Sequence, residues 1–271
     1  MDLTKTLLLG LIAGVTIVLG VPLGRIRRPL PSLRLMLNAV AVGILIFLIW
    51  DVLAHAWDPI DKALGAAHEH TGGLAPAFGY GALFAGGLAV GLLSLVAYER
   101  YMGRATRSAD GGGSPARRLA LLIAVGIGLH NFAEGLAIGQ SAASNELALA
   151  TMLVIGFGLH NATEGFGIVA PLAADLDEHG VRRIPSWGYL LMLALIGGGP
   201  TFVGTWVGHG FTSEAVSVIF LTLAAGSILY VVIQLLGVAA RARRSDLLAQ
   251  GLLIGLLAGF ITDAVVTFGG A

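Results

Sequence analysis

The sequence contains no cysteine, which excludes disulfides, thiolate metal sites, iron–sulfur clusters and cysteine nucleophiles. Charged residues are scarce as well: they make up 12% of the 271 residues, about half of the roughly 25% usual in a soluble domain. Sixteen Lys and Arg balance sixteen Asp and Glu, so no basic face is available and no nucleic-acid partner is expected. Hydrophobic residues supply 56% and glycine 40 residues, a composition typical of an integral membrane protein.

Apolar windows of about 20 residues, the length needed to cross a bilayer as a helix, predict eight transmembrane helices. Their expected ranges are 3–21, 35–56, 76–99, 118–142, 147–171, 187–208, 214–238 and 247–270. The connections are too short for a soluble domain, so residues 1–271 are expected to form a single all-α transmembrane domain. Small and polar residues predict that 100–117 is a flexible cytoplasmic loop between the third and fourth spans.

The arginines predict the orientation of these spans. Only Lys5 and Lys62 fall on the opposite side from the other fourteen basic residues, a strong asymmetry of the kind that marks the cytoplasmic side. Both termini are therefore expected outside. The first apolar run precedes the arginine cluster, so it is predicted to be a retained span rather than a cleaved signal peptide. A compact multi-pass chain of this kind favours a cell membrane, either plasma or inner.

A polar motif occurs twice at an offset of thirty residues. Residues 126–139 read GIGLHNFAEGLAIG and residues 156–169 read GFGLHNATEGFGIV, with eight of fourteen positions identical. On a helix, His and a Glu four residues later share one face, with Asn beside the His. The candidate metal ligands are His130, Asn131, Glu134, His160, Asn161 and Glu164.

The depth of this motif favours a functional site. Both copies lie near the middle of consecutive antiparallel spans, so they are expected at one level near the bilayer centre. Each buried carboxylate costs roughly 2.5 to 3.5 kcal/mol on insertion scales, and two neighbouring carboxylates repel each other unless a cation or proton lies between them. The alternative is a polar cluster that only fixes helix pairing. We expect instead that the cluster binds a divalent cation.

The donor set indicates the kind of metal. Nitrogen and oxygen donors without thiolate suit zinc, iron, manganese, cobalt or nickel, and the shortage of pure oxygen ligands disfavours magnesium and calcium. Neutral Asn donors weaken a metal site, which favours a transported ion over a resident cofactor. No resident cofactor is therefore expected. The alternative is a membrane metalloenzyme with a fixed metal. Di-iron bundles place His three residues after Glu, whereas here His precedes Glu by four, which disfavours that alternative.

The pair HNFAEG and HNATEG on consecutive spans resembles the metal-binding motifs of the ZIP (Zrt/Irt-like) divalent metal transporters. The resemblance implies a homodimeric importer, not an enzyme, that carries zinc foremost, or iron, manganese, cobalt or cadmium, through the six motif residues. It also implies that a transport unit of spans one, four, five and six moves against a scaffold of spans two, three, seven and eight, as in an elevator.

The sequence also departs from the family pattern. Ala133 and Thr163 stand where the family motif usually has proline, so any unwinding there must come from the flanking glycines. The sixth span lacks the acid that completes a second ion site in binuclear relatives, which favours one ion. Gln234 replaces an acidic residue of the seventh span, and the histidine-rich cytoplasmic loop is missing.

Two further acids lie within predicted spans. Asp51 and Asp263 are placed roughly 8 to 9 Å outward of the bilayer centre at about 1.5 Å of rise per residue. They could form an entrance site that collects cations. The alternative is that Asp51 pairs with His55 at the interface and that Asp263 is solvated near the chain end. The outer loop motif His68-Glu69-His70 is predicted to be a solvated turn.

Overall fold

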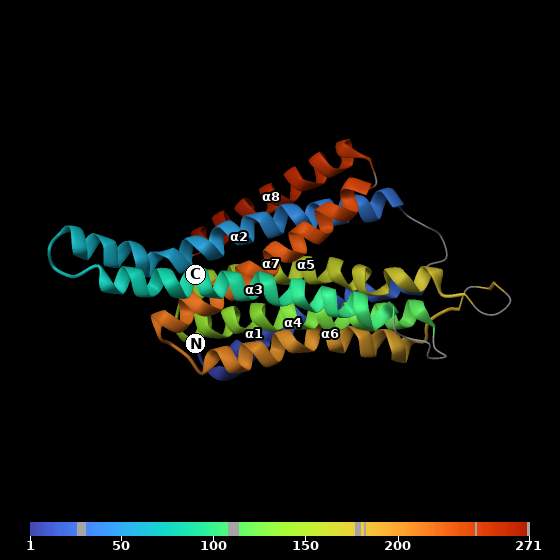
Figure 1. Cartoon of the computed structure of the whole chain (residues 1–271), viewed down its shortest axis with the longest axis horizontal. Coiled ribbons are helices and arrows are strands. Elements are labelled where there is room, and N and C mark those ends of the chain that lie inside the picture. The colour runs from blue at the N-terminus through green and yellow to red at the C-terminus, as the bar shows by residue number, and fades with distance from the viewer. Residues whose placement is uncertain (26–30, 108–113, 177–179, 182, 242, 270–271) are drawn as a thin grey trace.

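A computed structural model of the chain describes residues 1–271 except 26–30, 108–113, 177–179, 182, 242 and 270–271 (Figure 1). Among the described residues, eight α-helices are long and apolar enough to cross a membrane, which confirms the predicted all-α membrane class. They are α1 (Leu3–Val15), α2 (Pro31–His68), α3 (Ala75–Arg107), α4 (Pro115–Ala143), α5 (Leu147–Val169), α6 (Trp187–His209), α7 (Glu214–Arg241) and α8 (Ser245–Phe268). Three 3₁₀ helices accompany them: η1 (Thr16–Leu19), η2 (Val21–Arg25) and η3 (Ala170–Ala174).

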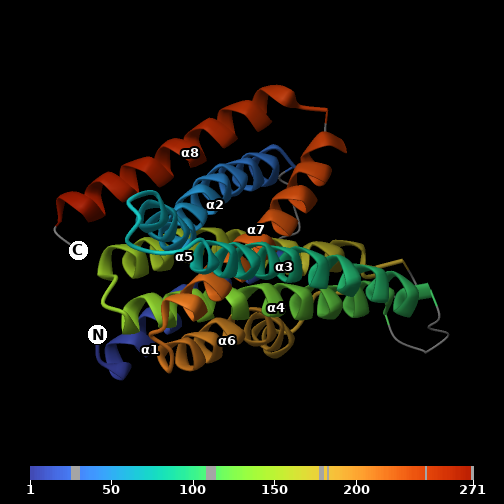
Figure 2. The same cartoon turned by 60° about the vertical axis from the view of Figure 1, so that its left-hand side comes forward.

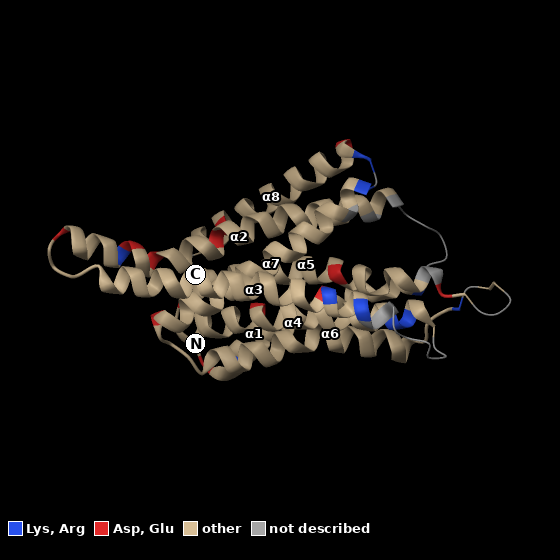
Figure 3. Cartoon of the chain, viewed as in Figure 1, with Lys and Arg blue, Asp and Glu red and all other residues tan. Residues whose placement is uncertain are grey.

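The two ends of the bundle differ in charge. The α3–α4, α5–α6 and α7–α8 connections lie at one end, here called the inner end, where the described arginines gather (Figure 3). The opposite, outer end carries both ends of the chain and the α2–α3 connection, and α2 and α3 extend beyond the other helices there (Figure 1). This arrangement agrees with the orientation predicted from the arginines.

Several helix boundaries differ from the expected ranges. Helix α2 continues to His68, so most of the expected outer loop is helical and the predicted turn at 68–70 closes it. Helix α3 reaches Arg107 and α4 begins at Pro115, where Ser114 accepts a hydrogen bond from the Arg117 amide as N-cap. The expected loop of 100–117 is thus helical at both ends, and its centre, 108–113, lies outside the described residues.

The first span is not one continuous helix. Helix α1 ends at Val15, and η1 and η2 carry the chain on to Arg25. Gly20 lies so close to α5 that a Cβ there would overlap the carbonyl oxygen of Ala162. Helices α4 and α5, in contrast, run unbroken through both motifs. The helix is therefore interrupted in the first span, beside α5, and not at the motif glycines of α4 and α5.

The helices pack as two groups of four. Helices α1, α4, α5 and α6 form one group, and α2, α3, α7 and α8 form the other. Within the first, α4 and α6 meet backbone to backbone, since a Cβ on Gly135 or Gly204 would overlap a carbonyl of the partner helix. Gly91 and Gly226 join α3 to α7 in the same way. Figure 2 shows α2 and α8 on the opposite side of the bundle from α1 and α6. This is the division into two groups of four helices that the family resemblance implied.

Candidate metal site

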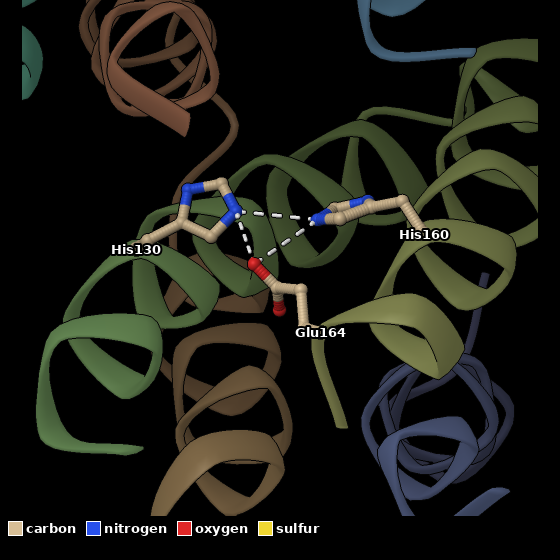
Figure 4. A group of neighbouring side chains, drawn as sticks. All are labelled: His130, His160 and Glu164. Carbon is tan, nitrogen blue, oxygen red and sulfur yellow. Dashed lines mark hydrogen bonds and ion pairs between the residues drawn. The ribbon is translucent and has the colours of Figure 1, made fainter. Parts of the chain in front are cut away.

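The two motif copies bring four metal-binding side chains to one point. His130 and Glu134 come from α4, and His160 and Glu164 come from α5. Their exposed fractions are 1%, 0%, 1% and 7%, so all four are buried among the spans. Figure 4 shows that His130, His160 and Glu164 point toward one another from facing helices.

The separations between these donors suit a small metal ion. The Nε2 atoms of His130 and His160 lie 3.3 Å apart. Glu134 Oε1 lies 3.1 Å and 3.4 Å from these two nitrogens, and Glu164 Oε1 lies 3.5 Å and 3.6 Å from them. Ligands at about 2.0 to 2.1 Å from a four-coordinate zinc are about 3.3 Å from one another. His130, His160 and Glu164 form a group that could hold one ion, whereas Glu134 approaches both imidazoles but lies outside that group.

In the described structure the two imidazoles are the close polar neighbours of both carboxylates. Glu134 Oε1 and Glu164 Oε1 lie 3.1 to 3.6 Å from His130 Nε2 and His160 Nε2. Burying a carboxylate without donors or a counter-charge costs several kcal/mol. A proton on an imidazole supplies this counter-charge or, with the imidazoles neutral, a divalent cation bound beside the carboxylates supplies it.

The two asparagines are oriented by backbone carbonyls of their own helix group. Asn131 Nδ2 donates to Gly197 O of α6 at 2.9 Å, and Asn161 Nδ2 donates to Ala13 O of α1 at 3.1 Å. With each amide nitrogen engaged, each Oδ1 is left as the free acceptor, and both Oδ1 atoms are buried without a hydrogen-bond partner. Both amides could therefore offer oxygen to a cation.

A serine on α7, not anticipated from the sequence, orients one imidazole. His130 Nδ1 lies 3.0 Å from Ser227 Oγ, which itself donates to Ala224 O at 2.8 Å. When the hydroxyl proton goes to Ala224 O, Nδ1 donates to Ser227 and the Nε2 lone pair faces the cluster, the form that binds metal. A lone serine in an apolar span carries no motif that could have revealed this role.

A pocket of about 400 Å³ leads from the cluster toward the inner end. His130, His160 and Glu164 line it, and further inward it is lined by Glu99, which accepts a hydrogen bond from Gln234 Nε2 at 3.1 Å. Its lining positions extend from the middle of α4 and α5 toward the inner ends of α2, α3, α4, α5 and α7, with Ala170 at the start of η3. The cluster therefore faces the arginine-rich side.

Apolar side chains fill the corresponding space on the outer side of the cluster. They form one buried core between the two helix groups, built from α2, α4, α5 and α7 together with Ala13 of α1. Leu48, Leu153, Phe157 and Leu221 are among its members, each at most 1% exposed. The described structure thus has a pocket on the inner side of the cluster and a packed apolar core on the other.

The two predicted entrance acids lie on neighbouring scaffold helices. Asp51 of α2 is 6% exposed, and its Oδ1 lies 3.5 Å from His55 Nδ1, the contact that the interfacial alternative predicted. Its Oδ2 has no hydrogen-bond partner. Asp263 of α8 is half-buried and interacts electrostatically with Asp51. The structure thus brings the two acids near each other, apart from the residues that line the inner pocket.

Apolar spans around a buried His and Glu cluster define a multi-pass membrane protein with a candidate metal centre. A family model described as ZIP Zinc transporter matches residues 104–266, which include both motifs. The chain belongs to this family, as its motifs predicted, and the family transports divalent metal ions. A search of curated proteins found no match.

Proposed function

We propose that this protein imports a divalent transition metal, zinc foremost, into the cytosol. His130, Glu134, His160 and Glu164 would bind the ion, and Asn131 and Asn161 would add weaker oxygen donors. The observation that carries the proposal is the buried four-donor cluster at the end of a pocket directed to the arginine-rich side. No resident cofactor or catalytic residue is assigned.

We further propose alternating access by movement of the α1, α4, α5 and α6 group against the other four helices. The support is that the motif ligands and the carbonyls that orient the asparagines all belong to this group, whereas the contact of His130 with Ser227 of α7 crosses to the other group and would break during the movement. On the outer side of the cluster, the interface between the two helix groups is apolar. Such an interface suits sliding, because few polar contacts need to be exchanged.

Three finer assignments complete the proposal. Asp51 and Asp263 would act as an entrance site, supported by their shared depth and electrostatic interaction. The protein would function as a homodimer in the lipid of a plasma or inner membrane. Exposed apolar side chains along α8, such as Leu253, Leu257 and Ile261, offer a surface for lipid or for a second copy.

The deciding experiment is Zn²⁺ uptake by purified protein in liposomes. The double variant Glu134→Ala, Glu164→Ala is expected to abolish uptake, because it removes both charges that compensate the ion. Glu69→Gln, on the outer turn far from the motifs in sequence, serves as the matched control and should transport normally. Uptake that persists in the double variant refutes the assignment. Tightly retained metal with no uptake by the wild-type protein would favour the metalloenzyme alternative.

A further inference from the structure

A second pocket of about 180 Å³ lies at the outer end, between the two helix groups. Its walls come from the outer part of α2, the end of α4 with the α4–α5 turn, the α6–α7 connection and the start of α7. The side chains that give it chemical character are His55, Asp58, Lys62, Gln140, Glu146 and Glu214. It lies across the apolar core from the central cluster and shares no lining residue with the inner pocket.

The charges of this outer pocket favour a cation. Three carboxylates line it, from Asp58, Glu146 and Glu214, against one ammonium, that of Lys62. Burial raises the pKa of the Glu146 carboxyl; His55 and Lys62 oppose this shift, and Asp58 and Glu214 add to it. Glu146 therefore interacts with every other charged or titratable group of the pocket, and the carboxylates are close enough to repel one another.

A neutral side chain supplies an independent sign of a ligand. Gln140, near the end of α4, is 1% exposed, and its Nε2 donates to Ser144 Oγ at 2.9 Å. Its Oε1 is buried without any hydrogen-bond partner although Gln140 lines the pocket. A buried acceptor without a donor is costly, and a bound cation or its water shell would satisfy it.

We propose that the outer pocket binds a hydrated divalent cation through the carboxylates of Asp58, Glu146 and Glu214 and the Oε1 of Gln140. The volume suits an ion that keeps part of its water shell, because one water occupies about 30 Å³. Asp58 and Glu214 come from α2 and α7, whereas Gln140 and Glu146 come from α4 and the α4–α5 turn. A cation bound here joins the two helix groups at their outer ends.

The test measures Zn²⁺ binding by equilibrium dialysis on full-length protein whose central site is disabled by Glu134→Ala and Glu164→Ala and whose proposed entrance site is disabled by Asp51→Asn and Asp263→Asn. His68→Gln and His70→Gln remove the imidazoles of the outer turn, which could bind zinc by themselves. This background is expected to retain one weaker site. Adding Asp58→Asn, Glu146→Gln and Glu214→Gln should weaken binding by about tenfold or more, because ligand charge sets the affinity of such sites.

Lys62→Gln is expected to tighten binding, and Glu69→Gln, an acid outside the pocket, should leave it unchanged. Glu146→Gln alone should weaken Zn²⁺ binding by a smaller factor, and it replaces the triple variant in the test if the triple variant does not fold. No residual site in the background, or a site that the triple variant leaves unaltered, overturns the proposal. Either result leaves the proposed function intact, because uptake by the wild-type protein reports on the central cluster separately.

Discussion

Replacement of Ser227 by Ala tests whether the Ser227 hydroxyl sets the tautomer of His130 that binds metal. The hydroxyl is 2% exposed and is the group that fixes the proton of His130 on Nδ1. Without it, the imidazole either keeps a buried Nδ1–H without a partner, at about 1 to 3 kcal/mol, or moves the proton to Nε2 and loses its metal-binding lone pair. Loss of such an outer hydrogen-bond partner typically lowers metal affinity by about 10- to 100-fold.

The assay is competitive Zn²⁺ binding to purified Ser227→Ala protein, followed by the KM of uptake in liposomes. We expect Kd and KM to rise together while the amount of folded protein stays unchanged. Ser94→Ala is the matched control, because Ser94 donates only to Gly91 O within its own helix, α3. Unchanged Zn²⁺ affinity in Ser227→Ala would show that the contact with His130 does not control the donor form of the imidazole.

Two further predictions concern acids outside the central cluster. Asp51→Asn should raise the KM of uptake by about 3- to 10-fold without changing the maximal rate, since it removes a charge that attracts cations; a KM equal to that of the wild-type protein would leave only the interfacial pairing with His55. At the inner end, burial raises the pKa of Asp175, but hydrogen bonds from Ser114 and Arg117 outweigh this and hold it below 3.8. The ionised Asp175 carboxylate therefore contributes its full stabilisation at pH values above its pKa in the unfolded chain. This stabilisation is lost as the pH falls through its pKa in the folded protein. Asp175→Asn should lower the melting temperature at pH 7, by a difference that shrinks below about pH 4; a difference independent of pH would contradict this.

Most of the fold could be predicted from the sequence because its cause is local. A run of about 20 apolar residues must become a helix in lipid, and the arginine distribution orients the set. The duplicated motif was visible because acids and imidazoles are rare in such spans. Helix ends were less predictable: α2 runs on to His68 through polar residues that give no membrane signal, and it continues past Pro59, a residue type that usually ends or kinks a helix.

The parts of the site that could not be predicted depend on contacts between distant helices. Ser227 meets His130 across 97 positions of sequence, and the carbonyls that orient Asn131 and Asn161 belong to α6 and α1. A backbone carbonyl has no sequence signature at all. The break after Val15 likewise follows from the close approach of the first span to α5, not from its own composition alone.

The glycine contact between α4 and α6 has a consequence for the membrane itself. Because backbone touches backbone at Gly135 and Gly204, α4 cannot slide or rotate without carrying α6 along. The outward face of α6 holds exposed apolar side chains, including Leu195 and Trp206. The proposed movement of α4 would therefore displace the acyl chains beside α6, and the viscosity and lateral pressure of the bilayer would then contribute to the turnover rate.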